Sequence, residues 1–408
     1  MNSPTRLLKA LHVSDVRGLA DVAVQATRDV TAVVEGVHRS VHATLGLPGG
    51  QHPGRTTGIT GLVYRSIDGI TRLTGAGLRA SLAFGEPLAR RLGHEPLASR
   101  EREVLLGILN GVLGDQLAAT RNPLALPMTL RYRGQEIGRD EPQPSTDVGG
   151  RLLVMIHGLC MTDHGWRPRE DDARPDMGAV LAARLGHTPL YLRYNSGRAV
   201  TANGLDLAKQ LEKLVEYWPV PVEEITLLGH SMGGLLARSA VAHGARLGHA
   251  WPRRLSSLVF LGTPHHGAPL ERAGAWVETL LHATPYTRPF AALSSRRSRG
   301  IRDLRHGEIG SVENGSRPGA DRGKGPDRSG TRAAPRLPAG VRVLAVAGTR
   351  ASRARAMEVG VGAGDLPGDG LVPVASALGK HPDAERDLCL PDSSRLVIPG
   401  TSHMGLLG

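Results

Sequence analysis

The chain has 408 residues, enough for one large domain or two ordinary ones, and 40% of them are hydrophobic, so a sizeable core can form. Its net charge is +12, but aromatic residues make up only 3% and no nucleic-acid motif occurs, which argues against a nucleic-acid partner. The two cysteines, Cys160 and Cys389, lie far apart without metal-ligand spacing, which argues against a disulfide framework and a metal site.

No targeting or spanning segment is evident. The N-terminus Met1–Arg17 lacks the uninterrupted apolar core of a secretory signal, and no run approaches the roughly 20 apolar residues needed to span a bilayer. We therefore expect a cytoplasmic protein, with peripheral attachment to a membrane surface left open. Much of the positive charge falls in Ser294–Arg342, so the folded surface is expected to be nearly balanced.

The first third of the chain, residues 1–122, has a helical pattern. Apolar residues recur every three or four positions from Leu19 to Val41, and again from Ile59 to Leu73, which is typical of amphipathic helices. A third helix is predicted from Ser99, a good N-cap, through Leu117. We expect an all-helical N-terminal region that packs on the rest of the chain or on itself, or lies in a membrane interface.

Residues 127–408 change to short apolar runs that alternate with helical segments, which predicts an α/β domain with a mostly parallel sheet. A helix is predicted over 205–218, and a flexible or cap insertion at about 268–340, where Gly, Ser, Pro and Arg are abundant. The predicted strands are Met128–Tyr132, Leu152–Ile156, Leu190–Tyr194, Ile225–Leu228, Leu258–Leu261, Val341–Ala347 and Leu396–Ile398.

A serine stands between the fourth of these strands and a helical pattern, in the sequence Gly229-His230-Ser231-Met232-Gly233. Gly-x-Ser-x-Gly at such a junction is a nucleophile elbow. Small residues two before and two after the serine let neighbouring backbones pass, and the strained turn exposes the hydroxyl above the sheet edge. We therefore expect Ser231 to be a nucleophile.

A serine hydroxyl needs a base, and the base needs an orienting acid. On this type of sheet the chain order is serine, acid, histidine. His403, in a loop after the last predicted strand, is the best candidate base, and His381, in a polar loop, is a weaker one. Asp369, with glycines on both sides, is the best candidate acid, and Asp365 is the second choice.

Attack on an ester or amide creates an oxyanion that needs preorganised donors. One should be the backbone N–H of Met232, directly after the nucleophile. The other should come from the loop 157–160, which follows an earlier strand and offers the N–H of Leu159. Asp163 and His164, a little further on, either line the pocket or belong to a solvated loop.

The chain from about Pro127 to Gly408 resembles the α/β-hydrolase superfamily, and within it bacterial lipases and esterases. It is also similar to lipase-like enzymes that deacylate phosphatidylinositol anchors. The resemblance implies a central sheet flanked by helices, with Ser231 as nucleophile, His403 as base and Asp369 as acid. The matching motifs are His157-Gly158-Leu159, Gly229–Gly234, Leu261–Gly267, Asp369–Pro373 and Gly400–His403.

These features predict a serine hydrolase that cleaves carboxylic esters through an acyl-enzyme, without cofactor or metal. An acyltransferase, thioesterase or amidase would use the same triad, and a lipid-surface or granule-binding protein on a hydrolase scaffold is a further alternative. The apolar stretch Leu270–Leu281 is either part of a lid or an ordinary surface helix. The substrate-binding residues and the oligomeric state are left open.

Overall fold

The structure, a computed structural model, divides into two compact units. The N-terminal unit comprises Met1–Arg102 with Leu117–Ala125, and the sheet unit comprises Glu103–Gln116 with Leu126–Gly408. The structure describes residues 13–44, 62, 65–74, 76–77, 80, 100–138, 148–167, 175–269, 298–307, 309, 337–353 and 366–408.

This division differs in one respect from the predicted boundary between residues 122 and 127. The third predicted helix occurs as α4 (Arg100–Ala119), but its middle, Glu103–Gln116, belongs to the sheet unit. Almost every apolar side chain of this stretch is buried, among them Leu106, Leu109 and Val112. The middle of α4 is therefore part of the core of the sheet unit.

The N-terminal unit contains α2 (Val13–Thr44), a helix of 32 residues that includes the first predicted amphipathic stretch. Asp15 lies in its first turn, where the helix dipole favours an acidic side chain, and accepts hydrogen bonds of 2.6 and 2.9 Å from Arg102. Residues 65–74 are also helical, within the second predicted helix. None of the helices in the described ranges is long and apolar enough to span a bilayer.

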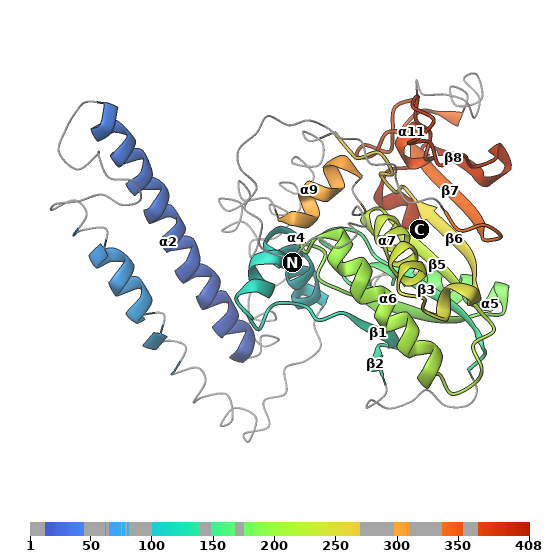
Figure 1. Cartoon of the computed structure of the whole chain (residues 1–408), viewed down its shortest axis with the longest axis horizontal. Coiled ribbons are helices and arrows are strands. Elements are labelled where there is room, and N and C mark those ends of the chain that lie inside the picture. Colours follow the sequence, from blue (N-terminus) through green and yellow to red (C-terminus); the bar gives the residue numbers. More distant parts are fainter. Residues whose placement is uncertain are drawn as a thin grey trace. The chain divides into compact units, whose positions relative to one another are not determined.

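The described part of the sheet unit has an eight-stranded sheet in the order β2-β1-β4-β3-β5-β6-β7-β8 (Figure 1). β1 runs antiparallel to both β2 and β4, and all neighbours from β4 to β8 are parallel, which confirms the predicted fold class. The strands are β1 (Thr129–Tyr132), β2 (Gln135–Ile137), β3 (Arg151–Ile156), β4 (Thr188–Arg193), β5 (Glu224–His230), β6 (Leu255–Leu261), β7 (Arg342–Thr349) and β8 (Arg395–Pro399).

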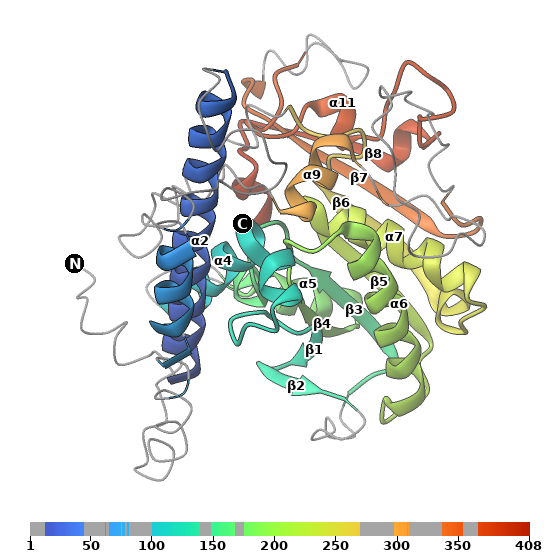
Figure 2. The same cartoon turned by 60° about the vertical axis from the view of Figure 1, so that its left-hand side comes forward.

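Helices cover both faces of this sheet (Figures 1 and 2). α6 (Val200–Tyr217) and α7 (Met232–Arg246) pack on one face, and α5 (Met177–Leu185) packs on the other. β3 is buried on both sides: Val154 and its alternate neighbours face the cluster with α6 and α7, and Met155 faces the side of α5. Such a continuous apolar run is what a central parallel strand requires.

One helix of the predicted insertion is described, α9 (Arg299–His306). Ser298 caps it, because its Oγ accepts a hydrogen bond from the N–H of Ile301. The same hydroxyl donates to the carbonyl of Gly111 in α4 at 2.7 Å, so α9 is tied to the sheet unit. Most of the remainder of the insertion, including the predicted lid stretch Leu270–Leu281, lies outside the described residues.

The strand order brings the ends of β3 and β5 together. β3 lies between β4 and β5, so the chain moves to one side of β3 first and then returns to its other side. Ligands of open α/β sheets bind at the carboxyl ends of the strands at such a reversal. The short helix α11 (Val374–Ala377) and the loops after β7 and β8 complete the same edge.

Candidate active site

Ser231 lies at the junction of β5 and α7 in strained backbone geometry, with φ 54° and ψ −124°. Its N–H donates to the carbonyl of Leu261 at the end of β6, at 2.8 Å. A Cβ on Gly229 would meet the backbone of Gly234, and one on Gly233 would meet the carbonyl of Ile156. The two glycines of the motif are thus required by close backbone approach, as the sequence predicts.

Asp369 and His403 form a buried pair. Asp369 follows β7 and His403 follows β8, and the parallel pairing of these strands places both loops at one edge. Oδ2 of Asp369 accepts a hydrogen bond from Nδ1 of His403 at 2.7 Å, and the backbone N–H of His403 donates to the carbonyl of Asp369 at 3.0 Å. With Nδ1 held by the carboxylate, Nε2 is the nitrogen of His403 that can exchange a proton.

The carboxylate of Asp369 is stabilised in its charged form. Oδ1 accepts hydrogen bonds from the N–H groups of Leu371 at 2.9 Å and Val372 at 2.8 Å. Burial acts to raise the pKa of Asp369, but the bond to His403 and the two N–H groups outweigh it and hold that pKa below its ordinary value. Asp369 is therefore an anion at neutral pH, as a partner for an imidazolium must be.

Two residues connect this pair with the elbow. Gly262, at the end of β6, has φ 58°, and a Cβ there would lie 3.2 Å from Oδ2 of Asp369 and 3.3 Å from Cε1 of His403. His230, the residue before Ser231, shares a hydrogen bond of 3.0 Å between its Nε2 and the carbonyl of His403. Burial lowers the pKa of His230 to about 3, so its neutral ring donates this bond.

The loop 157–160 after β3 adjoins the serine. A Cβ on Gly158 would lie 3.0 Å from Cβ of Ser231. Leu159 is buried, and no hydrogen bond among the described residues engages its N–H. Met232 is the first residue of α7, so its N–H has no acceptor within the helix. Leu159 therefore follows a residue that contacts Ser231, and Met232 follows Ser231 itself; their role as oxyanion donors stays a prediction.

Two residues that sequence reasoning missed hold this loop, Tyr194 and Ser196. The ring of His157 stacks on that of Tyr194 at 4.3 Å between centroids, and Oη of Tyr194 donates to the carbonyl of His157 at 2.8 Å. The N–H of Cys160 donates to Oγ of Ser196 at 3.1 Å. The sequence feature that could have indicated them is a tyrosine followed by Asn195-Ser196 at the end of β4, the strand that neighbours β3.

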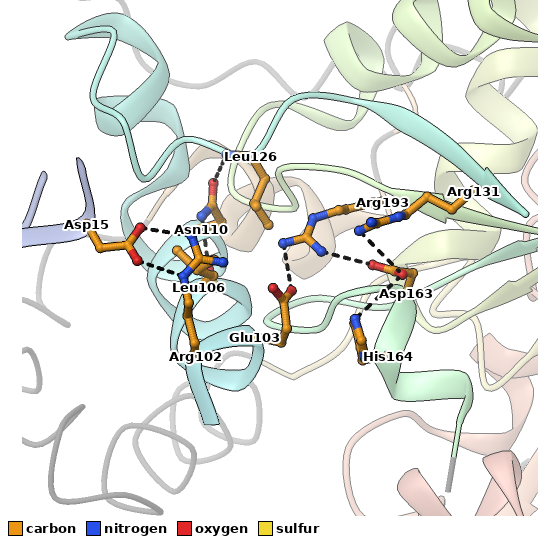
Figure 3. A network of polar contacts seen from close by, with 10 residues as sticks. All are labelled: Asp15, Arg102, Glu103, Leu106, Asn110, Leu126, Arg131, Asp163, His164 and Arg193. Atoms are coloured by element: carbon orange, nitrogen blue, oxygen red, sulfur yellow. Dashed lines mark hydrogen bonds and ion pairs between the residues drawn. The ribbon is translucent and has the colours of Figure 1, made fainter. Parts of the chain in front are cut away.

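Asp163, a few residues further along this segment, belongs to a buried network of ion pairs (Figure 3). Its carboxylate lies 3.4 Å from Nη1 of Arg193 and 3.9 Å from Nη1 of Arg131. Arg193 in turn contacts Glu103 of α4 at 2.6 Å, and His164 reaches to within 4.0 Å of Asp163. Because Asp163 is buried between two arginines, it does not belong to a solvated loop.

His381, the weaker candidate base, and His265 have ring contacts with groups other than Asp369. His381 packs its ring on that of His266 at 4.9 Å. Nδ1 of His265 accepts a hydrogen bond of 3.2 Å from Nη1 of the buried Arg238. Asp365, the alternative acid, lies outside the described residues.

Comparison with known proteins agrees with this architecture. Residues 147–304 match the family model of the PGAP1-like alpha/beta domain. A search of the curated proteins found no match. The strand order and the elbow are those of the α/β-hydrolase fold, and the family match lies within the unit that carries them.

Solved structures similar to the chain include two hydrolases. The mature form of Bacillus licheniformis lipase BlEst2 is 18% identical, with 69% of this chain and 92% of that chain covered and a TM-score of 0.39. Pyrococcus furiosus esterase Pf2001 is 16% identical, with 36% and 52% covered and a TM-score of 0.24. Scores this low add no weight to the fold that the strand order already defines.

Proposed function

We propose that the protein is a serine hydrolase of carboxylic esters, of the lipase or esterase type. The observation that carries the proposal is the buried Asp369–His403 hydrogen bond of 2.7 Å, linked through Gly262 and His230 to the strained Ser231. A serine on an elbow, a histidine oriented by a carboxylate and two available N–H groups are the parts that acyl transfer requires.

The proposed reaction proceeds in two halves. Oγ of Ser231 attacks the ester carbonyl while Nε2 of His403 takes its proton, and the N–H groups of Leu159 and Met232 bind the oxyanion. The C–O bond then breaks, His403 gives its proton to the leaving alkoxide, and the acyl group stays on Ser231. Water attacks this acyl-enzyme with His403 as base, and collapse of the second oxyanion releases the acid and restores the serine. Asp369 stabilises the imidazolium throughout.

The proposal also concerns the acceptor of the acyl group and the class of substrate. Water as acceptor gives a hydrolase, another alcohol gives an acyltransferase, and thioester or amide substrates would use the same groups. We propose an ester of a lipid-like acyl chain, and a cytoplasmic protein with peripheral membrane contact. Liposome flotation of the full chain at low salt tests the membrane part, and absence from the floating fraction would contradict it.

The hydrolytic activity is tested with p-nitrophenyl esters of several chain lengths, together with thioesters, anilides and phospholipids. We expect ester turnover by the wild type and a loss of at least about 10³-fold in kcat for Ser231→Ala. Undiminished turnover by Ser231→Ala would refute the proposal. Product analysis with and without added alcohol separates hydrolysis from acyl transfer, because only a transferase gives the new ester at low alcohol concentration.

A further inference from the structure

The middle of α4 lies directly against the loop that carries one oxyanion donor. A Cβ on Gly107 would be 3.0 Å from the carbonyl oxygen of Cys160 and 3.1 Å from the carbonyl carbon of Met161. A Cβ on Gly111, one turn later, would meet Sγ of Cys160 and lie 2.9 Å from both its Cα and its N. Two successive turns of α4 therefore contact the backbone immediately after Leu159.

Cys160 is held in a conformation that depends on this contact. Its φ is 61°, in the left-handed region that a residue with a Cβ adopts only under strain, and its Sγ lies against Gly111. This contact and the bond from the Cys160 N–H to Ser196 hold the peptide between Leu159 and Cys160. Leu159 stands between this peptide and the one that carries its own N–H, so a displacement of Cys160 would be transmitted to that N–H through a single residue.

The same helix also contacts the loop after β4. A Cβ on Gly114 would meet the side chain of Asn195, whose Nδ2 donates to the carbonyl of Gly114 at 2.8 Å. The next residue, Ser196, accepts the N–H of Cys160. α4 thus supports the loop of Leu159 from two directions, by direct contact with Cys160 and through Ser196.

A third connection is electrostatic (Figure 3). Glu103, one turn before Gly107, contacts Nη2 of Arg193 at 2.6 Å, and Nη1 of Arg193 contacts Asp163 at 3.4 Å. Arg193 and Asp163 are both buried, so this pairing is screened little by solvent. Asp163 lies four residues after Leu159, and its position is thereby tied to α4 as well.

We propose that Glu103–Asp115 of α4 is a positioning element of the oxyanion hole. Gly107 and Gly111 let the helix approach the loop closely enough to hold Cys160, the residue directly after the donor Leu159, and Glu103 ties the far end of the loop through Arg193. This inference rests on the proposed function, because it concerns a donor of that same site. It assigns a catalytic purpose to residues outside the matched range 147–304.

The substitution Gly111→Ala tests the proposal. The added methyl displaces Cys160, so we expect kcat for ester hydrolysis to fall about 10²-fold with KM and the pH–rate profile little changed. The concentration of active enzyme is measured by prolonged titration with a fluorophosphonate, so that unfolded protein is not counted. Gly69→Ala is the matched control, since nothing lies within 4 Å of a Cβ there, and it should retain wild-type kcat.

A rescue variant separates positioning from general damage. Cys160→Gly in the Gly111→Ala background removes Sγ and relieves the positive φ, and we expect it to restore at least about tenfold in kcat. Glu103→Gln, a gentler change, should lower kcat several-fold by weakening the contact to Arg193. If Gly111→Ala retains wild-type kcat per active site, the proposal is wrong, whatever the result for Glu103→Gln.

The variant Ser231→Ala tests the proposed function independently of the role of α4. Loss of activity in Ser231→Ala together with normal kcat in Gly111→Ala overturns only the role of α4. Retained activity in Ser231→Ala overturns the serine mechanism itself. A fall in thermal stability of Gly111→Ala without a fall in kcat per titrated site would make the contact structural alone, and would also contradict the proposal.

Discussion

Both carboxylate oxygens of Asp369 are engaged, Oδ2 by His403 and Oδ1 by two backbone N–H groups. The carboxylate therefore cannot rotate away without breaking three hydrogen bonds. This arrangement fixes the tautomer of His403, because a carboxylate accepts only from a protonated Nδ1. In the proposed mechanism that tautomer leaves the lone pair on Nε2 toward the serine.

Replacement of Asp369 should lower kcat strongly and affect the fold little. Asp369→Asn keeps the shape but can stabilise the wrong tautomer of His403, so we expect kcat for ester hydrolysis to fall about 10³–10⁴-fold. Steady-state kinetics with a p-nitrophenyl ester measures the effect. Asp365→Asn, at the alternative acid, is the matched control and should keep nearly full activity. The reverse ranking of these two variants would assign the acid to Asp365.

At the scale of elements, the end of β6 connects the two halves of the site. Leu261 accepts the N–H of Ser231, and Gly262 lies against Asp369 and His403. The positive φ of 58° turns the chain out of the sheet at this point. A Cβ at this position would crowd Asp369 and His403.

This crowding predicts a strong effect of Gly262→Ala on activity. The new methyl would lie 2.8 Å from Leu406 and within 3.3 Å of His403, so we expect kcat to fall at least about tenfold. Gly248→Ala is the control, because Gly248 also has a positive φ (68°) but has open space around it. Each variant should lose about 1 kcal/mol of unfolding free energy from backbone strain. Equal activity of the two variants would mean that crowding is unimportant.

Elements with strong local sequence patterns could be predicted, whereas elements and contacts that form only through pairing with another segment of the chain could not. Ser231, Asp369 and His403 stand in short motifs at strand ends, and the structure brings Asp369 and His403 together beside the elbow. β2 was missed because Gln135-Glu136-Ile137 is short and mostly polar, and it exists by pairing with β1. The contacts of α4 with Cys160 join residues nearly 50 positions apart, and no periodicity in either segment encodes them.

At the scale of the whole molecule, the neutral histidines in the sheet unit make stability depend on pH. Burial lowers the pKa of His157 to about 4 and that of His230 to about 3, against about 6.5 in an unfolded chain. Above pH 6.5 both states hold these rings neutral. As the pH falls from 6.5 toward 4, these histidines bind protons in the unfolded chain but not in the folded chain, so the folded state loses stability.

The free energy of unfolding should therefore decrease on mild acidification, by up to about 1.4 kcal/mol per pH unit for each histidine. Asp369, whose pKa is lowered, adds a loss of the same sign only below about pH 3.8. Urea midpoints at pH 7.5, 6 and 5 measure the trend. His157→Asn should be less stable at pH 7.5 and show a shallower slope. A midpoint equal at pH 7.5 and pH 5 would contradict the neutral burial of these rings.

The proposed serine mechanism passes through one covalent intermediate, the acyl group on Oγ of Ser231. Rapid mixing with a p-nitrophenyl ester should give a burst of p-nitrophenol close to one equivalent of active enzyme. Acid quenching followed by mass spectrometry should then find the acyl mass on the peptide that contains Ser231, and no such adduct in Ser231→Ala. Acylation of another residue, or turnover without any adduct on Ser231, would contradict the account.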